Sequence, residues 1–331
     1  MANGILIFAE ITRDRYIHTG FFELANKANE LSRKLDEPVM AVILAEPGLA
    51  LEFKEGFVNS GIDKVFVYEH NVFKKYSTQI YSKLITELVK EIDPSVFLIS
   101  ATNLGRDLAP RISSVLKTGL TADCIDLDIN EKGQLAATRP TFGGQLMATI
   151  LCKTFPQMAT VRPKVFKPTS ENNYKNTEFI YKLINEEDLK SDVEIINFTK
   201  KLEDTINELD SAEIIVSGGK GMKGADGFNL LKQLADKLGG TVGASRGAVD
   251  SGYAPQSIQI GQTGKTVTPK IYIACGISGA MQHTCGITGS DHIIAINTDE
   301  NAPIFNVADT GIVGDAFEII PQMLENLNNE I

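Results

Sequence analysis

The sequence predicts an α/β protein with two domains: a doubly wound, mostly parallel sheet in the N-terminal half and a second α/β domain in the C-terminal half. Three observations support this fold class. Short, continuously apolar runs alternate with amphipathic segments of helical spacing. The chain has 331 residues, which corresponds to about two domains at ~150 residues each. Glycine-rich loops follow the apolar runs of the second half.

The first half contains apolar runs with the length of buried strands, at 4–11, 39–45, 64–69 and 95–101. The segments between and after them have apolar residues at helical spacing, over 18–35, near 47–60, from Tyr81 to Ile92 and over 105–117. Strands that are apolar on both faces and alternate with helices are typical of a parallel sheet covered on both sides.

The pattern changes between residues 123 and 166. Extended segments are interrupted there by Gly143–Gly144, Pro140, Pro156 and Pro163, which predicts antiparallel edge strands or a hairpin added to the sheet. Residues 167–210 are polar, and only 191–198 has a rough strand alternation. We therefore expect the domain boundary within 200–210, dividing the chain into 1–205 and 206–331.

The second half resumes the α/β alternation. Strands are expected within 212–221, at the short TVGASR segment, and over 270–276, 292–297 and 303–309. An intervening helix carries Leu231, Leu234 and Leu238 on one face and should end at Gly239–Gly240. A last helix is expected over 315–328.

Composition excludes several classes of function. The net charge of −10 and the isoelectric point near 5.0 argue against a nucleic-acid or anionic-membrane partner. No apolar run reaches the ~18–20 residues that span a bilayer, and no basic segment precedes the first apolar run, so neither membrane insertion nor a signal peptide is expected. The four cysteines lack paired CxxC spacing, which predicts reduced thiols in a cytoplasmic protein.

The first glycine-rich loop of the second half, SGGKGMKG (217–224), contains a formal G-x-G-x-x-G. Alone it would indicate a dinucleotide fingerprint, but the acidic residue expected about 20 positions later is missing, and Ala244-Ser245-Arg246 stands there. The loop therefore either binds phosphate or is an ordinary strand-to-helix turn.

Two further loops carry polar side chains between glycines. Arg246 can pair with a phosphate or stack on an aromatic ring, or it can be a surface arginine paired with Asp250. The IGQTGKTV segment (260–267) offers Gln262 and Thr263 as donors but does not have Walker A spacing, so a hairpin turn is the alternative.

The ACGISGAMQHTCG segment (274–286) is expected to open a helix at Ser278–Gly279, where backbone amides suit a pyrophosphate. A serine hydrolase is excluded because Ala280 stands where G-x-S-x-G requires glycine. His283 has no recognised metal-ligand spacing with Cys275 or Cys285, so it is either structural or part of a nucleotide site.

Polar residues end the last strands of the predicted sheet. Asn297 and Asp299, then Asp309 and Asp315, could take ribose hydroxyls or an adenine edge. Asp315 could equally be the N-cap of the last helix.

In their order along the chain, these segments resemble the electron transfer flavoprotein family, alpha subunit. The resemblance covers essentially the whole chain and rests on blocks at 105–124, 138–150, 216–224, 242–265, 271–283, 294–305 and 307–315. It implies a chain that binds FAD non-covalently in its C-terminal domain and pairs through its N-terminal domain with a beta subunit. Such a pair passes electrons between a dehydrogenase, such as an acyl-CoA dehydrogenase, and other redox carriers.

The resemblance also assigns cofactor-binding residues. It implies a phosphate contact for Lys220, the flavin and phosphates for Ser245 and Arg246, and the pyrimidine end of the flavin for His283. The remaining assignments are the flavin edge for Ile260, Gly261, Gln262 and Thr263, the diphosphate for Ser278, Gly279, Ala280, Met281 and Gln282, and the adenosine half for Asn297 and Asp315. A positive arginine and a hydrogen-bonding histidine near the pyrimidine ring would favour an anionic flavin. No catalytic side chain and no metal are expected, and oxidoreductase activity would arise only in a complex.

Some residues depart from the family pattern. Lys220 replaces an arginine, and HTCGI (283–287) differs from the common motif. The segment 252–267 resembles the branch of the family that bifurcates electrons, in which the beta subunit carries a second FAD and takes electrons from NADH, with ferredoxin as an acceptor of the complex. In this family the FAD domain can swing, and the polar 200–210 junction is compatible with such a hinge. Two other functions remain open: an NADP-dependent dehydrogenase with Arg246 on the 2′-phosphate and His283 as acid, or a nucleotide-sensing module.

Overall fold

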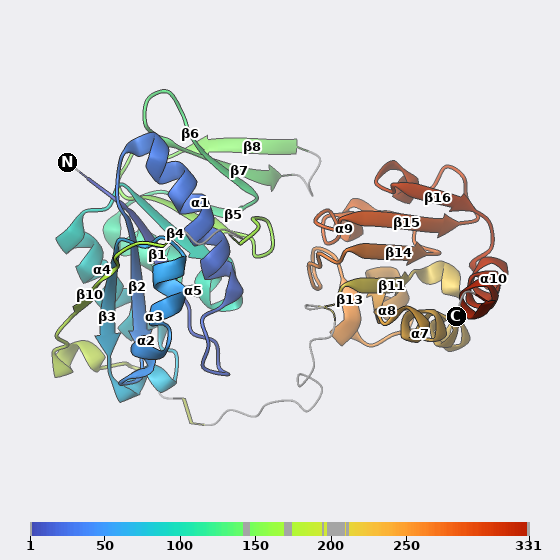
Figure 1. Cartoon of the computed structure of the whole chain (residues 1–331), viewed down its shortest axis with the longest axis horizontal. Coiled ribbons are helices and arrows are strands. Elements are labelled where there is room, and N and C mark those ends of the chain that lie inside the picture. Colours follow the sequence, from blue (N-terminus) through green and yellow to red (C-terminus); the bar gives the residue numbers. More distant parts are fainter. Residues whose placement is uncertain are drawn as a thin grey trace. The chain divides into compact units, whose positions relative to one another are not determined.

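The computed structural model describes residues 2–141, 146–168, 174–193, 195–196, 209 and 212–329 (Figure 1). Contacts divide the chain into two units, Met1–Thr141 with Leu146–Phe198, and Phe142–Gln145 with Thr199–Ile331. The boundary that we predict between residues 205 and 206 lies outside the described residues and stays a prediction.

The N-terminal unit is built on a seven-stranded parallel sheet with the order β10-β3-β2-β1-β4-β9-β5. Every residue of β1, β2 and β4 is buried, which is the pattern expected for central strands covered on both faces. The predicted strands 4–11, 39–45, 64–69 and 95–101 are confirmed. The bounds of the strands are β1 (Ile5–Ala9), β2 (Val39–Ala45), β3 (Lys64–Glu69), β4 (Val96–Ser100), β5 (Leu120–Cys124), β9 (Gln157–Val161) and β10 (Glu178–Tyr181).

Helices cover both faces of this sheet, so the unit is doubly wound. Phe21 and Leu24 of α1 pack in one apolar cluster, whereas Leu84 of α4 and Ile112 of α5 pack in a second cluster. The helix expected near 47–60 is two short helices. The helices are α1 (Thr19–Leu35), α2 (Leu49–Glu52), α3 (Lys54–Asn59), α4 (Thr78–Ile92) and α5 (Asn103–Leu116), with the 3-10 turns η1 (Asn71–Lys74) and η3 (Glu186–Leu189).

The antiparallel pairing predicted between residues 123 and 166 is confirmed for the strands on either side of Gly143–Gly144, but not its place in the main sheet. Strands β6 (Asp126–Ile129), β7 (Leu135–Thr141) and β8 (Leu146–Leu151) form a separate three-stranded antiparallel sheet, not an extension of the main one. The prediction of an antiparallel edge strand is wrong for β9, which pairs in parallel with β4 and β5 inside the main sheet. The polar Gln157 at the start of β9 obscured this strand in the sequence. Its side chain can be buried because it accepts a hydrogen bond from the backbone of Leu135 at 2.8 Å. Strand β10 lies in the polar region 167–210, where the sequence predicted strand alternation only at 191–198. The described residues of 191–198 form no strand.

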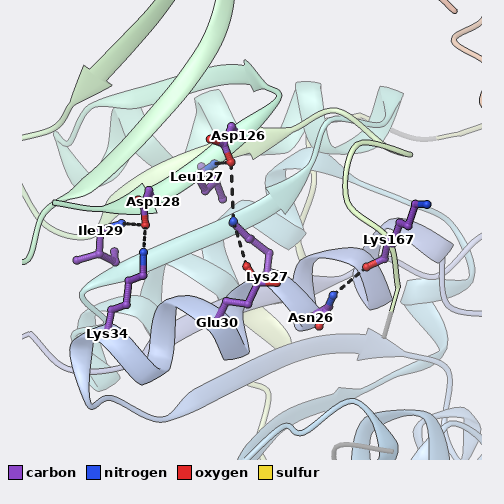
Figure 2. Close-up of polar contacts among 9 residues, drawn as sticks. All are labelled: Asn26, Lys27, Glu30, Lys34, Asp126, Leu127, Asp128, Ile129 and Lys167. Carbon is purple, nitrogen blue, oxygen red and sulfur yellow. Dashed lines mark hydrogen bonds and ion pairs between the residues drawn. The ribbon is translucent and has the colours of Figure 1, made fainter. Parts of the chain in front are cut away.

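Polar contacts join the small sheet to α1 (Figure 2). Lys27 lies 3.8 Å from Asp126, and Lys34 contacts Asp128. The Lys34–Asp128 pair is exposed on both sides, and exposed ion pairs contribute at most ~1 kcal/mol each. Leu127, which lies between the two carboxylates and is fully buried in the same cluster as α1, therefore contributes more to the attachment.

The C-terminal unit has a six-stranded parallel sheet with the order β13-β12-β11-β14-β15-β16. The helix α7 ends as predicted at Gly239, which adopts the left-handed conformation with φ of 68°. The strands are β11 (Ile214–Gly218), β12 (Thr241–Ser245), β13 (Gln259–Ile260), β14 (Ile271–Cys275), β15 (His292–Asn297) and β16 (Thr310–Val313). The helices are α7 (Ala225–Leu238), α8 (Arg246–Asp250), α9 (Met281–Thr284) and α10 (Ala316–Asn329), with η5 (Lys220–Met222), η6 (Gln256–Ile258) and η7 (Pro303–Asn306).

The strand predicted over 303–309 is wrong. These residues begin with the 3-10 turn η7, and the strand β16 starts only at Thr310. Asp309 therefore lies at the amino end of β16, where its carboxylate accepts a hydrogen bond from the backbone of Ile293 at 2.7 Å. This places Asp309 at the end of the sheet opposite to the one where ligands bind. In the described part of the chain, no helix is both long and apolar enough to cross a membrane.

Candidate functional site

A cavity of about 710 Å³ lies at the carboxyl edge of the C-terminal sheet. β12 follows β11 in the chain and pairs with one edge of it, whereas β14 pairs with the other edge of β11. The strand order therefore reverses between β11 and β14, which makes this point a topological switch point. Loops that follow β11, β12, β13, β14 and β15 all contribute to the wall. Its lining residues are Lys220, Gly221, Ser245, Arg246, Gly247, Asp250, Gln259, Ile260, Gly261, Thr263, Gly276, Ile277, Ser278, Ala280, Gln282, His283, Asn297, Asp299, Ala302 and Pro303.

Most of the predicted cofactor-binding residues meet in this cavity, although they come from five separate loops. Gln262, Gly279, Met281 and Asp315 are not among the lining residues. Gln259, Gly276, Ile277, Ala302 and Pro303 line the cavity and were not among the predicted residues. Ala302 and Pro303 lie outside the predicted loops. The only signal for them in the sequence was their position shortly after the strand that ends at Asn297.

The glycines of the first loop serve two purposes. A side chain on Gly219 would place its Cβ 2.0 Å from the carbonyl oxygen of Gly276, and Gly221 donates a backbone hydrogen bond to that same oxygen at 3.1 Å. Gly219 is therefore required for close packing of the loops after β11 and β14. Lys220 and Gly221 line the cavity, so the loop is more than an ordinary turn.

Ser245 and Arg246 stand where β12 passes into α8. The Ser245 hydroxyl caps this short helix by accepting from the backbone of Ala248 at 3.4 Å. Arg246 Nε lies 3.2 Å from Asp250 Oδ2, which is the surface ion pair offered as the alternative role. Both side chains are more than 60% exposed, so the pair holds Arg246 weakly, and its charge remains available at the cavity.

The loop after β13 is not a hairpin. β13 pairs in parallel with β12, and Ile260 forms a parallel bridge with Lys265. The Thr263 hydroxyl accepts a hydrogen bond from the Gln259 side chain at 3.0 Å, which orients it. Gln262 is exposed, and its backbone donates to the carbonyl of Gln282 at 2.7 Å, so this loop is joined to α9.

We predicted that the loop after β14 would open a helix at Ser278–Gly279, and this prediction is wrong. Gly279 has φ of 84°, a left-handed value that a helix cannot continue, and its Cα packs against the backbone of Ile304. The helix α9 instead begins at Met281 after Ala280 and has one turn.

The consequence of this irregular loop is a run of unpaired donors. The backbone N–H groups from Ile277 to Gln282 donate no hydrogen bond to any group in the described parts of the chain. Ile277, Ser278, Ala280 and Gln282 line the cavity. Consecutive free N–H groups beside a cavity are suited to bind an anion such as a diphosphate.

His283 is buried, with 6% of its surface exposed. Its Nε2 lies 2.9 Å from the Tyr272 hydroxyl and its Nδ1 lies 3.1 Å from the carbonyl oxygen of Ile260. Burial lowers the pKa of His283 to about 4, although the hydrogen bond to Ile260 acts in the opposite direction. The imidazole is therefore neutral at pH 7.

The polar residues at the ends of β15 and β16 divide into two groups. Asn297 and Asp299 line the cavity, and the Asn297 side chain also donates to the carbonyl of Ile277 at 2.9 Å. Asp315 accepts a hydrogen bond from the backbone of Phe317 at 3.0 Å, which is the helix-capping role that we gave as the alternative.

A parallel α/β sheet with a cavity of this size at its switch point is the arrangement of a nucleotide-cofactor-binding protein, since small-molecule sites have volumes of ~300–1,000 Å³. Residues 5–188 match the electron transfer flavoprotein domain, and residues 208–288 match the electron transfer flavoprotein FAD-binding domain. The chain therefore belongs to the electron transfer flavoprotein family as an alpha subunit, and its cofactor is FAD.

The relatives agree with the family models over the full length. The chain is 47% identical over 326 residues to the electron transfer flavoprotein subunit alpha of Thermoanaerobacterium thermosaccharolyticum, covering 98% of this chain and 97% of the relative. It is 43% identical over 331 residues to the corresponding subunit of Megasphaera elsdenii, covering 99% and 97%. It is also 42% identical over 353 residues to the acryloyl-CoA reductase electron transfer subunit beta of Anaerotignum propionicum, covering 97% and 94%.

Proposed function

We propose that this chain holds FAD in the cavity of its C-terminal unit and, with a beta subunit, carries electrons from an acyl-CoA dehydrogenase or a similar flavoenzyme to other redox carriers. The run of free backbone N–H groups from Ile277 to Gln282 carries the proposal, because a diphosphate is a ligand that these donors can satisfy. The Anaerotignum propionicum relative is an electron transfer subunit of acryloyl-CoA reductase, which supports an acyl-CoA flavoenzyme as the partner.

The residues of the cavity suggest how the cofactor would be held. The loop 277–282 would bind the diphosphate, Lys220 would add a single positive charge beside it, and Asn297 would contact the adenosine half. Ser245 and Arg246 would lie at the flavin, with the Gln262 and Thr263 loop at its edge. FAD supplies the one- and two-electron chemistry when bound.

Arg246 then has a clear electrostatic role. Its guanidinium is permanently charged and is only weakly neutralised by Asp250, so it lowers the free energy of negative charge on a group bound beside it. The neutral His283 adds no such charge. This assigns the stabilisation of an anionic reduced cofactor to Arg246 in preference to His283.

We also propose that the chain is cytoplasmic and works in a complex that takes electrons from NADH and reduces ferredoxin by bifurcation. The resemblance of residues 252–267 to the bifurcating branch supports this role. The assay is the stoichiometry of FAD in the co-expressed complex: two FAD for each alpha–beta pair support bifurcation, and one contradicts it.

The diphosphate site can be tested by removing one N–H group without changing the backbone. Ala280 has φ of −54° and ψ of 141°, values that proline adopts. Ala280→Pro deletes a single donor, whereas the matched control Ala280→Ser keeps it. A hydrogen bond to a charged group is worth ~1.5–3 kcal/mol, so Ala280→Pro should weaken FAD binding by about 10- to 100-fold.

FAD release measured by fluorescence gives the dissociation constants of both variants in the complex. Equal affinities for Ala280→Pro and Ala280→Ser would show that the diphosphate does not bind this loop. A complex that contains no FAD and cannot be loaded with it would contradict the proposed function altogether.

A further inference from the structure

A second cavity, of about 430 Å³, lies at one edge of the N-terminal sheet. It is formed where β3 and the edge strand β10, which are neighbours in the sheet (Figure 1), meet α4 and the turn η3. The FAD-binding residues proposed above all belong to the C-terminal unit, so this cavity has no role in that site. Its lining residues are Tyr68, Leu84, Glu87, Leu88, Glu91, Ile180, Tyr181, Lys182, Leu183, Asn185 and Asp188.

The floor of this cavity is apolar and belongs to the core of the unit. Leu84 and Leu88 of α4 are buried in the same apolar cluster as Tyr68 of β3. Glu87 and Glu91 share the helix face of these leucines, because residues three, four and seven positions apart on a helix are neighbours. The helix α4 therefore presents both apolar side chains and carboxylates to the cavity.

The basic side chains near the cavity already have partners. Lys182 Nζ lies 2.7 Å from each carboxylate oxygen of Glu91, and Lys83 Nζ lies 2.6 Å from Asp188. Glu87, in contrast, makes no hydrogen bond or ion pair with any residue that the structure describes. The charge that remains unpaired at the cavity is therefore negative.

A buried hydroxyl without a partner also belongs to the cavity wall. Tyr68 is only 4% exposed, yet its hydroxyl forms no hydrogen bond within the described ranges of the chain. Burial raises the pKa of Tyr68, and the nearby charges of Glu91 and Glu87 raise this pKa further, so the hydroxyl lies at the acidic end of the cavity and stays protonated. A buried polar group without a partner is rare in folded proteins, and a ligand that fills the cavity would satisfy it.

Asn185 adds a further acceptor to the same wall. Its side-chain nitrogen donates to Asp188 Oδ2 at 3.2 Å, which leaves its side-chain oxygen free to accept. The groups available to a ligand are thus a carboxylate, an amide oxygen and a hydroxyl oxygen, above an apolar floor. This combination suits a cation that carries several N–H donors on an aliphatic stem, because the donors satisfy the oxygens and the stem covers the leucines.

We propose that this cavity binds an alkyl guanidinium or alkyl ammonium group. The stem would lie on Leu84 and Leu88, and the N–H groups would donate to Glu87, Asn185 and Tyr68. Such a group occurs in a free small cation and in the side chain of an arginine or lysine of another protein. The exposed rim residues Tyr181 and Leu183 would contact the neighbours of a side chain, but not a free cation.

The test uses n-butylguanidine as the probe and n-butylurea, which has the same shape without the charge, as its control. Saturation-transfer NMR on the alpha–beta complex gives the dissociation constant of each compound. We expect n-butylguanidine to bind and n-butylurea to bind at least about 10-fold more weakly, as loss of a charged hydrogen bond requires. Equal binding of the two compounds, or binding of neither, would overturn the proposal.

Variants test whether the probe lies in this cavity. Glu87→Gln should weaken n-butylguanidine binding about 10-fold, and Tyr68→Phe should weaken it about 3-fold, in proportion to a charged and a neutral hydrogen bond. Glu55→Gln is the matched control, because it removes the same charge from an exposed position on α3 of the same unit. Equal affinities in Glu87→Gln and Glu55→Gln, with melting temperatures like that of the native complex, would also overturn the proposal.

A capped Leu-Arg-Leu peptide distinguishes the two sources of the cation. If the peptide binds at least about 10-fold more tightly than n-butylguanidine, and Leu183→Ser removes this difference, the cation is the side chain of a partner protein. If the two bind equally, the cation is a free small molecule, and both outcomes support the proposed site. The proposal does not depend on FAD, because a complex that holds FAD but does not bind n-butylguanidine contradicts it and leaves the proposed function intact.

Discussion

The buried, neutral His283 should make the C-terminal unit sensitive to mild acid. An exposed histidine has a pKa near 6.5, and burial lowers the pKa of His283 to about 4 in the folded chain. As the pH falls below 6.5, the unfolded chain binds a proton at this residue and the folded chain does not. Stability contributed by the neutral state is therefore complete above pH 6.5 and is lost as the pH falls toward 4.

The magnitude follows from the gap between the two pKa values. At ~1.4 kcal/mol for each pH unit, His283 should cost the folded state about 2 kcal/mol by pH 5 and about 3 kcal/mol by pH 4. The perturbation is acidification of the complex, compared with the same acidification of His283→Gln, which cannot titrate at this position. The other histidines, His18, His70 and His292, are present in both proteins, so their contributions cancel in the difference.

Urea denaturation of the complex, followed by far-ultraviolet circular dichroism, measures the free energy of unfolding at pH 7, 6 and 5. The chain has no tryptophan, which makes circular dichroism the better signal. The native protein should lose about 2 kcal/mol more than His283→Gln between pH 7 and pH 5. Parallel losses in the two proteins would refute the reasoning, because they would mean that His283 has an ordinary pKa when folded.

Three other substitutions test the structure. Gly279→Ala should prevent stable FAD binding and lower the melting temperature of the complex, because its Cβ would lie 2.1 Å from the Ile304 backbone at φ of 84°. The control is Gly252→Ala, which is also at positive φ but faces open space and should keep FAD. Asp315→Ala should lower the free energy of unfolding by ~1 kcal/mol through loss of the helix cap, and Asp315→Asn should restore it; a loss of FAD affinity in both variants would instead indicate a cofactor contact. Burial alone would raise the pKa of Asp123, but the Arg162 hydrogen bond and the charges of neighbouring arginines lower this pKa. The stability that the carboxylate contributes should therefore be complete above pH 4 and lost below it. If Asp123→Asn had the same acid denaturation midpoint as the native chain, this prediction would be contradicted.

Long periodic segments of the sequence were sufficient to predict most of the fold. The buried strands from Ile5 to Ala9 and from Val39 to Ala45 are apolar at every position, which only a sheet covered on both faces accommodates. Glycine after Leu238 predicted the end of α7 because glycine adopts the left-handed conformation without a steric penalty. The order of the glycine loops likewise predicted which residues would share one cavity, since parallel strands bring their carboxyl ends to one edge.

The short segments depended on contacts that the local sequence does not contain. β9 begins with a buried glutamine whose side chain accepts a hydrogen bond from the backbone of Leu135, 22 positions away. The left-handed Gly279 is required by the close approach of Ile304 from another loop. The state of His283 depends on Tyr272 and Ile260, so the sequence alone left open whether the histidine was structural or functional. The sequence by itself determined the family, the parallel sheets and the edge of the C-terminal sheet at which the cavity lies. Only the tertiary structure decided the contacts of His283 and the free amides of 277–282, because hydrogen-bond partners are chosen by packing across the chain.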